Sequence, residues 1–202
     1  MMVTALQPIE NLSHIKRIHV ASYQAASGAG AAAMDELYEQ YRQVLANEPV
    51  TVEKFAYQLA FNLIPQIDVF TENGYTKEEM KMINETRKIL KKPDLRITAT
   101  TVRVPVENSH SESINIELEK PFELSELVET LKSFEGIIVQ DDPASEVYPI
   151  ATNTTGHDEV FVGRIRRDFS VENGVNLWVV ADNIRKGAAS NAIQIVEKMI
   201  EK

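Results

Sequence analysis

Arg103 and His110 are the two side chains whose types and spacing first suggest chemistry. They lie seven residues apart in "VRVPVENSHSES" (residues 102–113): Arg103 belongs to an alternating pattern typical of a strand, and His110 follows a turn at Asn108-Ser109. An arginine guanidinium binds a carboxylate through two parallel hydrogen bonds, and a neutral imidazole exchanges protons near pH 7. On pattern alone, a solvated strand arginine and a surface histidine remain the more ordinary interpretation.

Two further stretches contain residue types that bind ligands. "SYQAASGAG" (residues 22–30) is a loop of small residues that opens into a helix, and its Gly28 and Gly30 would let a ligand approach the backbone amides. Plain packing at a helix entry is favoured there, because no third glycine completes a dinucleotide-binding pattern. Glu78 and Lys81 lie three apart on one face of a predicted helix. Such a pair usually means a solvated ion pair, and alternatively presents opposite charges to a zwitterionic or phosphorylated ligand.

Composition and charge narrow the classes of function. The 202 residues include 21 basic and 30 acidic ones, and the net charge of -9 argues against binding to a nucleic acid backbone. The sequence has no cysteine, which excludes disulfides, thiolate metal sites and a cysteine nucleophile from this chain. No apolar run approaches the roughly 20 residues of a membrane span, and the start lacks the basic region of a signal peptide. We therefore expect a cytoplasmic protein with no metal, nucleic acid or membrane partner.

The elements that must position these residues can be outlined from periodicity. Alternating or short continuous apolar patterns predict strands at residues 16–22, 95–107, 113–119, 136–140, 158–169 and 175–182. Helical spacing predicts an N-terminal helix that stops around Pro8, and helices at residues 31–46, 77–90, 124–134 and 185–201. The helix at 77–90 should begin with a capping box of Thr76 and Glu79, and that at 31–46 should bury Ala33, Leu37, Tyr41, Val44 and Leu45. Strands often follow strands directly, which predicts an α+β fold: a mixed, largely antiparallel sheet of about five to seven strands with helices 31–46, 77–90 and 124–134 on one face.

Four stretches in one order resemble the bacterial aspartate-semialdehyde dehydrogenase family over nearly the whole chain: "SYQAASGAG", "YTKEEMKMINETRKIL", "VRVPVENSHSES" and "LWVVADNIRKGAASNAIQI". The resemblance is to the C-terminal catalytic and dimerisation domain, whose fold is that of the glyceraldehyde-3-phosphate dehydrogenase-like family. Family members begin with a nucleotide-binding domain and an N-C-S-T-I-Q segment with the nucleophilic cysteine, and "MMVTALQPIE" resembles the sequence a few residues after it. The resemblance therefore implies a homodimer that works with a missing NADP-binding domain. It assigns residues 1–184 to the catalytic and dimerisation domain and 185–202 to a C-terminal helix that packs on the NADP-binding domain in the full-length family.

The same resemblance implies a role for each candidate substrate-site residue. His110 matches the acid–base partner of the cysteine, and Arg103 matches the residue that binds the substrate's carboxylate. Gln24 matches a position that places the substrate. Glu78 and Lys81 match positions that contact the substrate's amino group and its phosphate.

Cofactor contacts are implied in the same way. Ser27 and Gly28 match positions that meet the nicotinamide end of NADP, and Asn183 matches a polar position that contacts the cofactor. One departure concerns Ser109, which stands where the family commonly has glycine before the active-site histidine.

The implied reaction is the reductive dephosphorylation of L-aspartyl 4-phosphate to aspartate semialdehyde by NADPH, a step of lysine, threonine and methionine biosynthesis. Without a cysteine, this chain alone is expected to be inactive and to bind NADP weakly or not at all. Two alternatives remain open. One is a domain of the related N-acetyl-glutamyl-phosphate reductase, against which Glu78 and Lys81 count because its substrate has no ammonium group. The other is a cysteine-free dimeric paralogue with a non-catalytic role.

Overall fold

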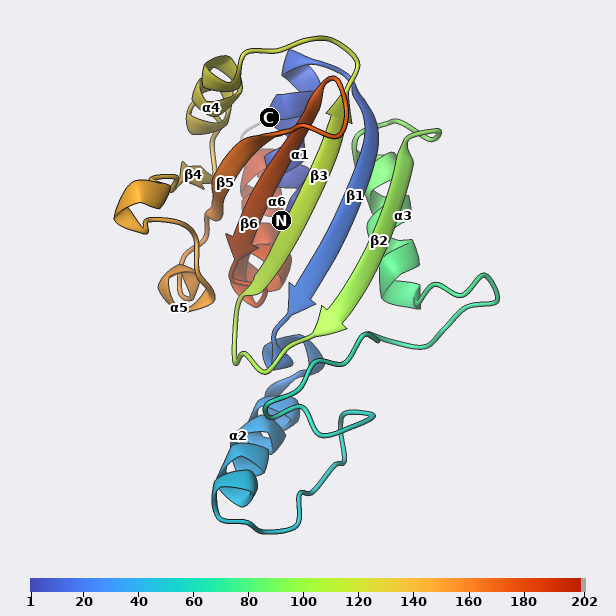
Figure 1. Cartoon of the computed structure of the whole chain (residues 1–202), viewed down its shortest axis with the longest axis vertical. Helices are drawn as coiled ribbons and strands as arrows, with labels where there is room; N and C mark the ends of the chain where they lie inside the picture. The colour runs from blue at the N-terminus through green and yellow to red at the C-terminus, as the bar shows by residue number, and fades with distance from the viewer. Residues whose placement is uncertain (201–202) are drawn as a thin grey trace.

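Six strands form one mixed sheet in the computed structural model, which describes residues 1–200 (Figure 1). The strands are β1 (Ile15–Gln24), β2 (Arg96–Arg103), β3 (His110–Leu118), β4 (Ile137–Val139), β5 (Val160–Asp168) and β6 (Gly174–Ala181). They lie in the order β2-β1-β3-β6-β5-β4. The pairs β1–β2 and β4–β5 are parallel, whereas β1–β3, β3–β6 and β5–β6 are antiparallel. The predicted mixed, largely antiparallel sheet is confirmed.

The helices are α1 (Met2–Leu12), α2 (Ala31–Leu45), α3 (Lys77–Ile89), α4 (Leu124–Lys132), α5 (Ala151–Thr154) and α6 (Ser190–Ile200). Two 3-10 turns, η1 (Ala26–Ala29) and η2 (Pro143–Ser145), and a π-helical segment, η3 (Arg185–Ala189), complete the elements. Helix α3 begins with the predicted capping box: the Glu79 amide donates to the Thr76 hydroxyl (3.2 Å), and the Glu79 carboxylate accepts from the Thr76 amide (2.8 Å). This box fixes the first turn of α3, which carries Glu78.

The main core lies between one face of the sheet and helices α1, α3 and α4. Alternate strand residues point into it because successive side chains of a strand lie on opposite faces, and those buried there include Ile18, Val20, Ile114, Ile116, Leu177 and Val179. Helices α1 and α6 lie behind the sheet in Figure 1, so these two helices leave the front face uncovered. On that face the rings of Tyr23 and Trp178 pack with their centroids 5.6 Å apart.

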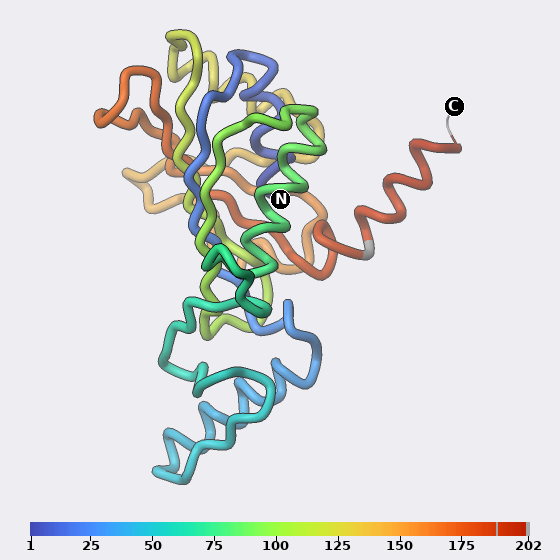
Figure 2. The backbone as a smooth tube through the Cα atoms, turned by 90° about the vertical axis from the view of Figure 1, so that its right-hand side faces the viewer, coloured from blue at the N-terminus to red at the C-terminus, as the bar shows by residue number. Residues whose placement is uncertain are grey.

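Two predictions about helices are wrong. Helix α1 does not stop at Pro8 but continues to Leu12, with Pro8 buried in its interior. A proline removes one backbone hydrogen bond, and here the fully buried side chains of Leu6 and Ile9 hold the helix on the sheet. Helix α2 does not cover the sheet: it lies beyond the strand ends, in a separate lobe with the loop that follows it (Figures 1 and 2).

The core of this lobe explains the error over α2. Leu37 packs there with Leu59, Ala60 and Ile64 from the irregular segment after the helix. Gln40 is fully buried in the same lobe, where its Oε1 accepts hydrogen bonds from the amides of Leu59 (2.7 Å) and Ala60 (3.1 Å). A glutamine thus occupies the buried face of α2. Leu45, which was predicted to share this face, is 76% exposed.

The C-terminal helix α6 extends away from the sheet and helices (Figure 2). Its apolar residues Ile193 (60%), Val196 (53%) and Ile200 (77%) are exposed, and residues 201 and 202 of the predicted helix segment lie outside the described residues. No helix within residues 1–200 has the length and apolar character needed to cross a membrane.

Candidate functional site

A cleft of about 840 Å³ opens on the helix-covered side of the sheet, where β1, β2 and β6 end and β3 begins. Its lining includes seven of the eight residues predicted for the site: Gln24, Gly28, Glu78, Lys81, Arg103, His110 and Asn183. The eighth, Ser27, lies beside the cleft and donates a hydrogen bond from its Oγ to Asn183 Oδ1 (3.1 Å). The structure therefore brings all eight residues together from four separate stretches of the sequence.

Strand register explains how Arg103, Gln24 and His110 meet. Strand β1 extends two residues further than predicted, and its last residue, Gln24, pairs directly with Arg103, the last residue of β2. On the other side, Tyr23 pairs with Ser111 in antiparallel β3, which brings His110 beside Gln24. Side chains in register on neighbouring strands point to the same face. The three residues thus form one row across the end of the sheet.

Ala25, just after β1, joins the two residues that first suggested chemistry. Its backbone N–H donates to His110 Nδ1 (3.1 Å), and its carbonyl accepts from Arg103 Nη1 (2.6 Å). Gly28 lies against the same pair: a Cβ there would be 2.8 Å from Arg103 Nη1 and 3.0 Å from His110 Cε1 and Nε2. Since a backbone amide can only donate, Nδ1 acts as the acceptor, and the neutral imidazole carries its hydrogen on Nε2.

Burial controls the charge of both groups. Burial, followed by the charge of Arg103, lowers the pKa of His110 to about 3, so the imidazole is neutral at pH 7. Burial also lowers the pKa of Arg103, and the negative charge of Glu78 opposes this effect. The Arg103 guanidinium, only 7% exposed, stays charged because its pKa starts far above neutrality. The cleft thus combines a buried cation with a neutral imidazole.

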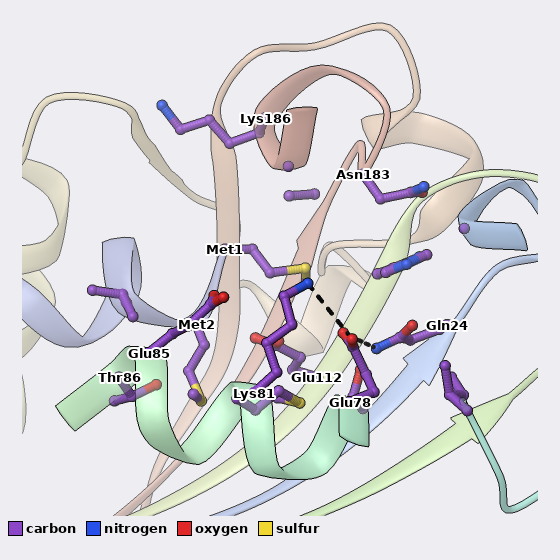
Figure 3. A pocket seen from close by; sticks show the side chains of 18 of the residues that line it. Met1, Met2, Gln24, Glu78, Lys81, Glu85, Thr86, Glu112, Asn183 and Lys186 are labelled. Carbon is purple, nitrogen blue, oxygen red and sulfur yellow. Dashed lines mark hydrogen bonds and ion pairs between the residues drawn. The ribbon is translucent and has the colours of Figure 1, made fainter. Parts of the chain in front are cut away.

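Glu78 and Lys81 on α3 form the opposite wall (Figure 3). Gln24 Nε2 donates to Glu78 Oε1 (3.3 Å), and Lys81 Nζ lies 3.6 Å from Glu78 Oε2. The Lys81 side chain is 58% exposed and the Glu78 side chain 24% exposed. Glu78 is therefore held inside the cleft, while Lys81 lies at its rim with an exposed ammonium group beside Glu78.

Asn183 holds the turn that precedes His110. Its Oδ1 accepts the backbone N–H of Ser109 (3.1 Å) and shares the single Ser27 hydroxyl hydrogen (3.1 Å) with Asn108 Oδ1 (2.9 Å). Ser109 has a φ of 69°, a left-handed conformation that favours glycine, and its Oγ lies 2.9 Å from Thr155 Oγ1. Within the described chain Asn183 Nδ2 has no hydrogen-bond partner, so its two donors are available to a ligand.

Sequence reasoning missed Asp182, which organises this corner of the cleft. The side chain is 3% exposed and accepts four N–H donors: Asn108 Nδ2 (3.1 Å), Gly156 N (2.9 Å), Ile184 N (2.9 Å) and Arg185 N (3.1 Å). An Asp at the end of an apolar strand, followed by a helical segment, is a typical capping pattern and could have indicated this role.

Glu112 was also missed. It lies two residues after His110 on β3, is 5% exposed and lines the cleft, and its carboxyl makes no hydrogen bond within the described residues. Burial raises the pKa of its carboxyl to about 7. The alternation of "HSES" with His110 facing the cleft could have placed Glu112 on the same face.

Residues 1–200 contain no group of three or more His, Asp or Glu side chains arranged to hold a metal ion. The features that could act on a ligand are thus a buried guanidinium, a neutral imidazole, an acidic wall and a lysine at the rim. A six-stranded mixed sheet backed by helices, with this charged cleft at the strand ends, defines an α+β domain with a candidate site for a charged ligand.

The chain belongs to the family described as "semialdehyde dehydrogenase, dimerisation domain", whose model matches residues 6–186. It is 51% identical over 201 residues to the aspartate-semialdehyde dehydrogenase of Aquifex aeolicus, covering 99% of this chain and 59% of that protein. It is 48% identical to that of Bacillus subtilis, covering 98% of this chain and 60% of the relative. The chain therefore spans about three fifths of the length of these relatives.

Solved structures point to the same family. The crystal structure of aspartate semialdehyde dehydrogenase II from Vibrio cholerae superimposes with a TM-score of 0.96 at 44% identity, over 100% of this chain and 59% of that one. A second structure of the Vibrio protein, complexed with ASA, matches equally well. The enzyme of Candida albicans with NADP matches at a TM-score of 0.71 and 22% identity, which shows the fold alone. These likenesses confirm the predicted fold class and the family resemblance.

Proposed function

We propose that this chain is the substrate-binding and dimerisation part of an aspartate-semialdehyde dehydrogenase. The whole protein would reductively dephosphorylate L-aspartyl 4-phosphate to aspartate semialdehyde with NADPH, a step that serves lysine, threonine and methionine biosynthesis in the cytoplasm. The supporting observation is the cleft, in which predicted site residues from four stretches of the sequence lie together. Membership of the dimerisation-domain family and 51% identity to the Aquifex enzyme point the same way.

The charges of the cleft complement this substrate. Arg103 uses one of its five N–H donors on Ala25, which leaves donors for a bidentate bond with the α-carboxylate. Glu78, already held by Gln24, would take the ammonium group, and Lys81 at the rim would take the phosphate. An N-acetylated substrate has no ammonium group for Glu78, which disfavours the related reductase as the alternative.

His110 would act on the reacting centre through Nε2. With Nδ1 engaged by Ala25, the Nε2–H can donate to the oxygen of the acyl group, and a second proton on Nδ1 would require the Ala25 bond to open. The nucleophile is a cysteine supplied by the rest of the protein. Met1 and Met2, at the start of α1, line the same cleft as His110. The cysteine thiolate attacks the acyl phosphate, phosphate leaves, and the resulting thioester is reduced to the aldehyde.

Ser27, Gly28 and Asn183 fit one end of the cofactor. Asn183 offers two unused N–H donors to an amide such as that of nicotinamide, and Gly28 presents backbone without a side chain. When bound, NADPH supplies the hydride. No other part of a cofactor site is assigned to this chain, and we expect its own affinity for NADPH to be weak or absent.

Dimerisation would use the open face of the sheet, where Tyr23 and Trp178 pack beside polar strand residues. A twofold pair of copies would cover this face on both molecules. Analytical ultracentrifugation tests the idea: we expect a dimer at micromolar concentration, whereas a stable monomer there would count against it.

The activity test compares this chain with the whole protein. The 202 residues alone should not oxidise NADPH in the presence of aspartyl phosphate, because they lack the thiolate. The whole protein should do so, and His110→Ala in it should lower kcat by about 10²–10⁴. His157→Ala, at an exposed histidine outside the cleft, is the matched control. Turnover by the chain alone, or full activity of the His110 variant, would refute the mechanism.

A further inference from the structure

Glu112 has a buried carboxyl that none of the roles above uses. It belongs to a second row of residues beneath Arg103, Gln24 and His110, and pairs in register with Ser22 on β1 and Val179 on β6. Ser22 is 1% exposed and, like Glu112, lines the cleft. Figure 3 shows Glu112 among the side chains gathered around Lys81 and Glu78. The carboxyl is thus part of the cleft rather than of the apolar core.

The basic side chains that line the cleft with Glu112 have other partners. Lys81 lies beside Glu78 (3.6 Å), Arg103 donates to Ala25, and Lys186 donates to Gln194 Oε1 (2.9 Å). The amino group of Met1 exerts a charge on Glu112 but forms no ion pair with it within the described chain. Burial is therefore the main influence on the carboxyl.

Each of the other titratable groups of the cleft has a hydrogen-bond partner, an ion-pair partner or contact with water. His110 is neutral and held by Ala25, Asp182 accepts four N–H donors, and Asp68 accepts the amide of Val69 (2.6 Å). Glu78 has Gln24 and Lys81, and Glu85 on α3 is exposed to water. Glu112 is the buried side chain whose oxygen, Oε2, lacks any hydrogen-bond donor among the described residues.

A carboxyl group in such a place is most stable when it carries a proton, because an isolated buried charge is costly. Protonated, it becomes an O–H donor, which an ionised carboxylate cannot be. Glu112 lines a cleft that also contains Arg103 and Lys81, both of which attract anions. The arrangement therefore suits an oxyanion that accepts a hydrogen bond as well as positive charge.

We propose that Glu112 is a second acid of the cleft, which donates its O–H to the phosphate of the ligand and gives up that proton when the phosphate leaves. This rests on the proposed function. In the step, the acyl C–O bond breaks, its electron pair goes to the phosphate oxygen, and that oxygen takes the proton of Glu112. Solvent then restores the proton to the carboxylate. The same group selects for oxyanions only while it is protonated, since the ionised form repels them.

Sulfate binding to this chain tests the anion contact, because sulfate keeps its charge between pH 5.5 and 8.5. Titrations followed by NMR should show an affinity that falls at least several-fold as the pH rises through about 7. Glu112→Gln should show a clearly smaller fall than the wild type, since a neutral amide of the same shape cannot ionise. Glu85→Gln removes an exposed glutamate from the same cleft and should keep the pH-dependent fall. Absence of sulfate binding, a flat wild-type profile, or an unchanged fall in the Glu112 variant would overturn the proposal.

Kinetics of the whole protein separate this proposal from the proposed function. Glu112→Gln should lower kcat by about 10²-fold or more with little change in KM, and the decline in kcat above neutral pH should disappear. If the wild-type protein does not reduce aspartyl phosphate, the proposed function itself fails. If the wild type is active and Glu112→Gln keeps its kcat and pH profile, only the role of Glu112 is refuted.

Discussion

Replacement of Asp182 by asparagine should destabilise the corner that holds His110. The carboxyl accepts Asn108 Nδ2 and Gly156 N through Oδ2, and Ile184 N and Arg185 N through Oδ1. An asparagine keeps one oxygen but turns an NH₂ group toward two of these donors, whichever way the amide is oriented. Two buried hydrogen bonds to a carboxylate are then lost, at about 1.5–3 kcal/mol each, which gives a loss of about 3–6 kcal/mol. That is a large part of the ~5–15 kcal/mol that typically stabilises a domain.

Urea-induced unfolding measures this loss directly, with Asp35→Asn on the exposed surface of α2 as the matched control. Amide hydrogen exchange adds the local test: residues 108–110 and 156 should exchange faster in Asp182→Asn, while β2 should keep its protection. If the variant does not fold, Asn108→Ala removes one of the four bonds, together with the bond that Asn108 Oδ1 accepts from Ser27 Oγ, and should give the same local pattern at a cost of about 1–2 kcal/mol. A loss below about 1 kcal/mol for Asp182→Asn, or unchanged exchange at 108–110, would refute the reasoning.

Four further outcomes are expected. Ser109→Gly should be about 1 kcal/mol more stable to urea than Ser109→Ala, because glycine alone adopts the φ of 69° without strain; equal stabilities would contradict this. Gly28→Ala should cost about 1–3 kcal/mol by urea unfolding, since its Cβ would displace the Arg103 guanidinium, and no loss would show that the cleft can relax. Burial raises the pKa of Glu112 from 4.5 to about 7. The stability that the protonated carboxyl contributes to the folded state is therefore full below pH 4.5 and is lost as the pH rises through 7. Glu112→Gln should abolish this fall, which is at most about 3 kcal/mol, and a fall that persists in the variant would disprove the cause. Finally, amides 190–200 should exchange faster in this chain than in the whole protein, where we propose that α6 packs on the NADP-binding part; equal protection would place the domain boundary elsewhere.

Local sequence patterns predicted most of the helices and strands correctly. Alternating or short continuous apolar patterns identified all six strands, and Thr76 with Glu79 marked the start of α3 because a capping box depends only on neighbouring residues. The same reasoning failed for α2. Its periodicity indicates which face is buried but not what covers it, and the cover is an irregular segment that Gln40 holds through backbone hydrogen bonds. The prediction that the first helix ends around Pro8 failed for a similar reason: burial of α1 against the sheet outweighs the one hydrogen bond that proline removes.

The sequence by itself determined the kinds of chemical group in the cleft and, through four motifs in order, the family to which the chain belongs. It could not show that Arg103 and His110 share Ala25, that Asn183 and Asp182 hold the turn before His110, or that Glu112 lies buried without a partner. These relations depend on the register of β1 against β2 and of β3 against β1 and β6, which brings together residues 74 to 85 positions apart in the chain. Side-chain burial and hydrogen-bond partners set both the protonation of an acid or imidazole and the direction in which it can donate, and only the tertiary structure decides them.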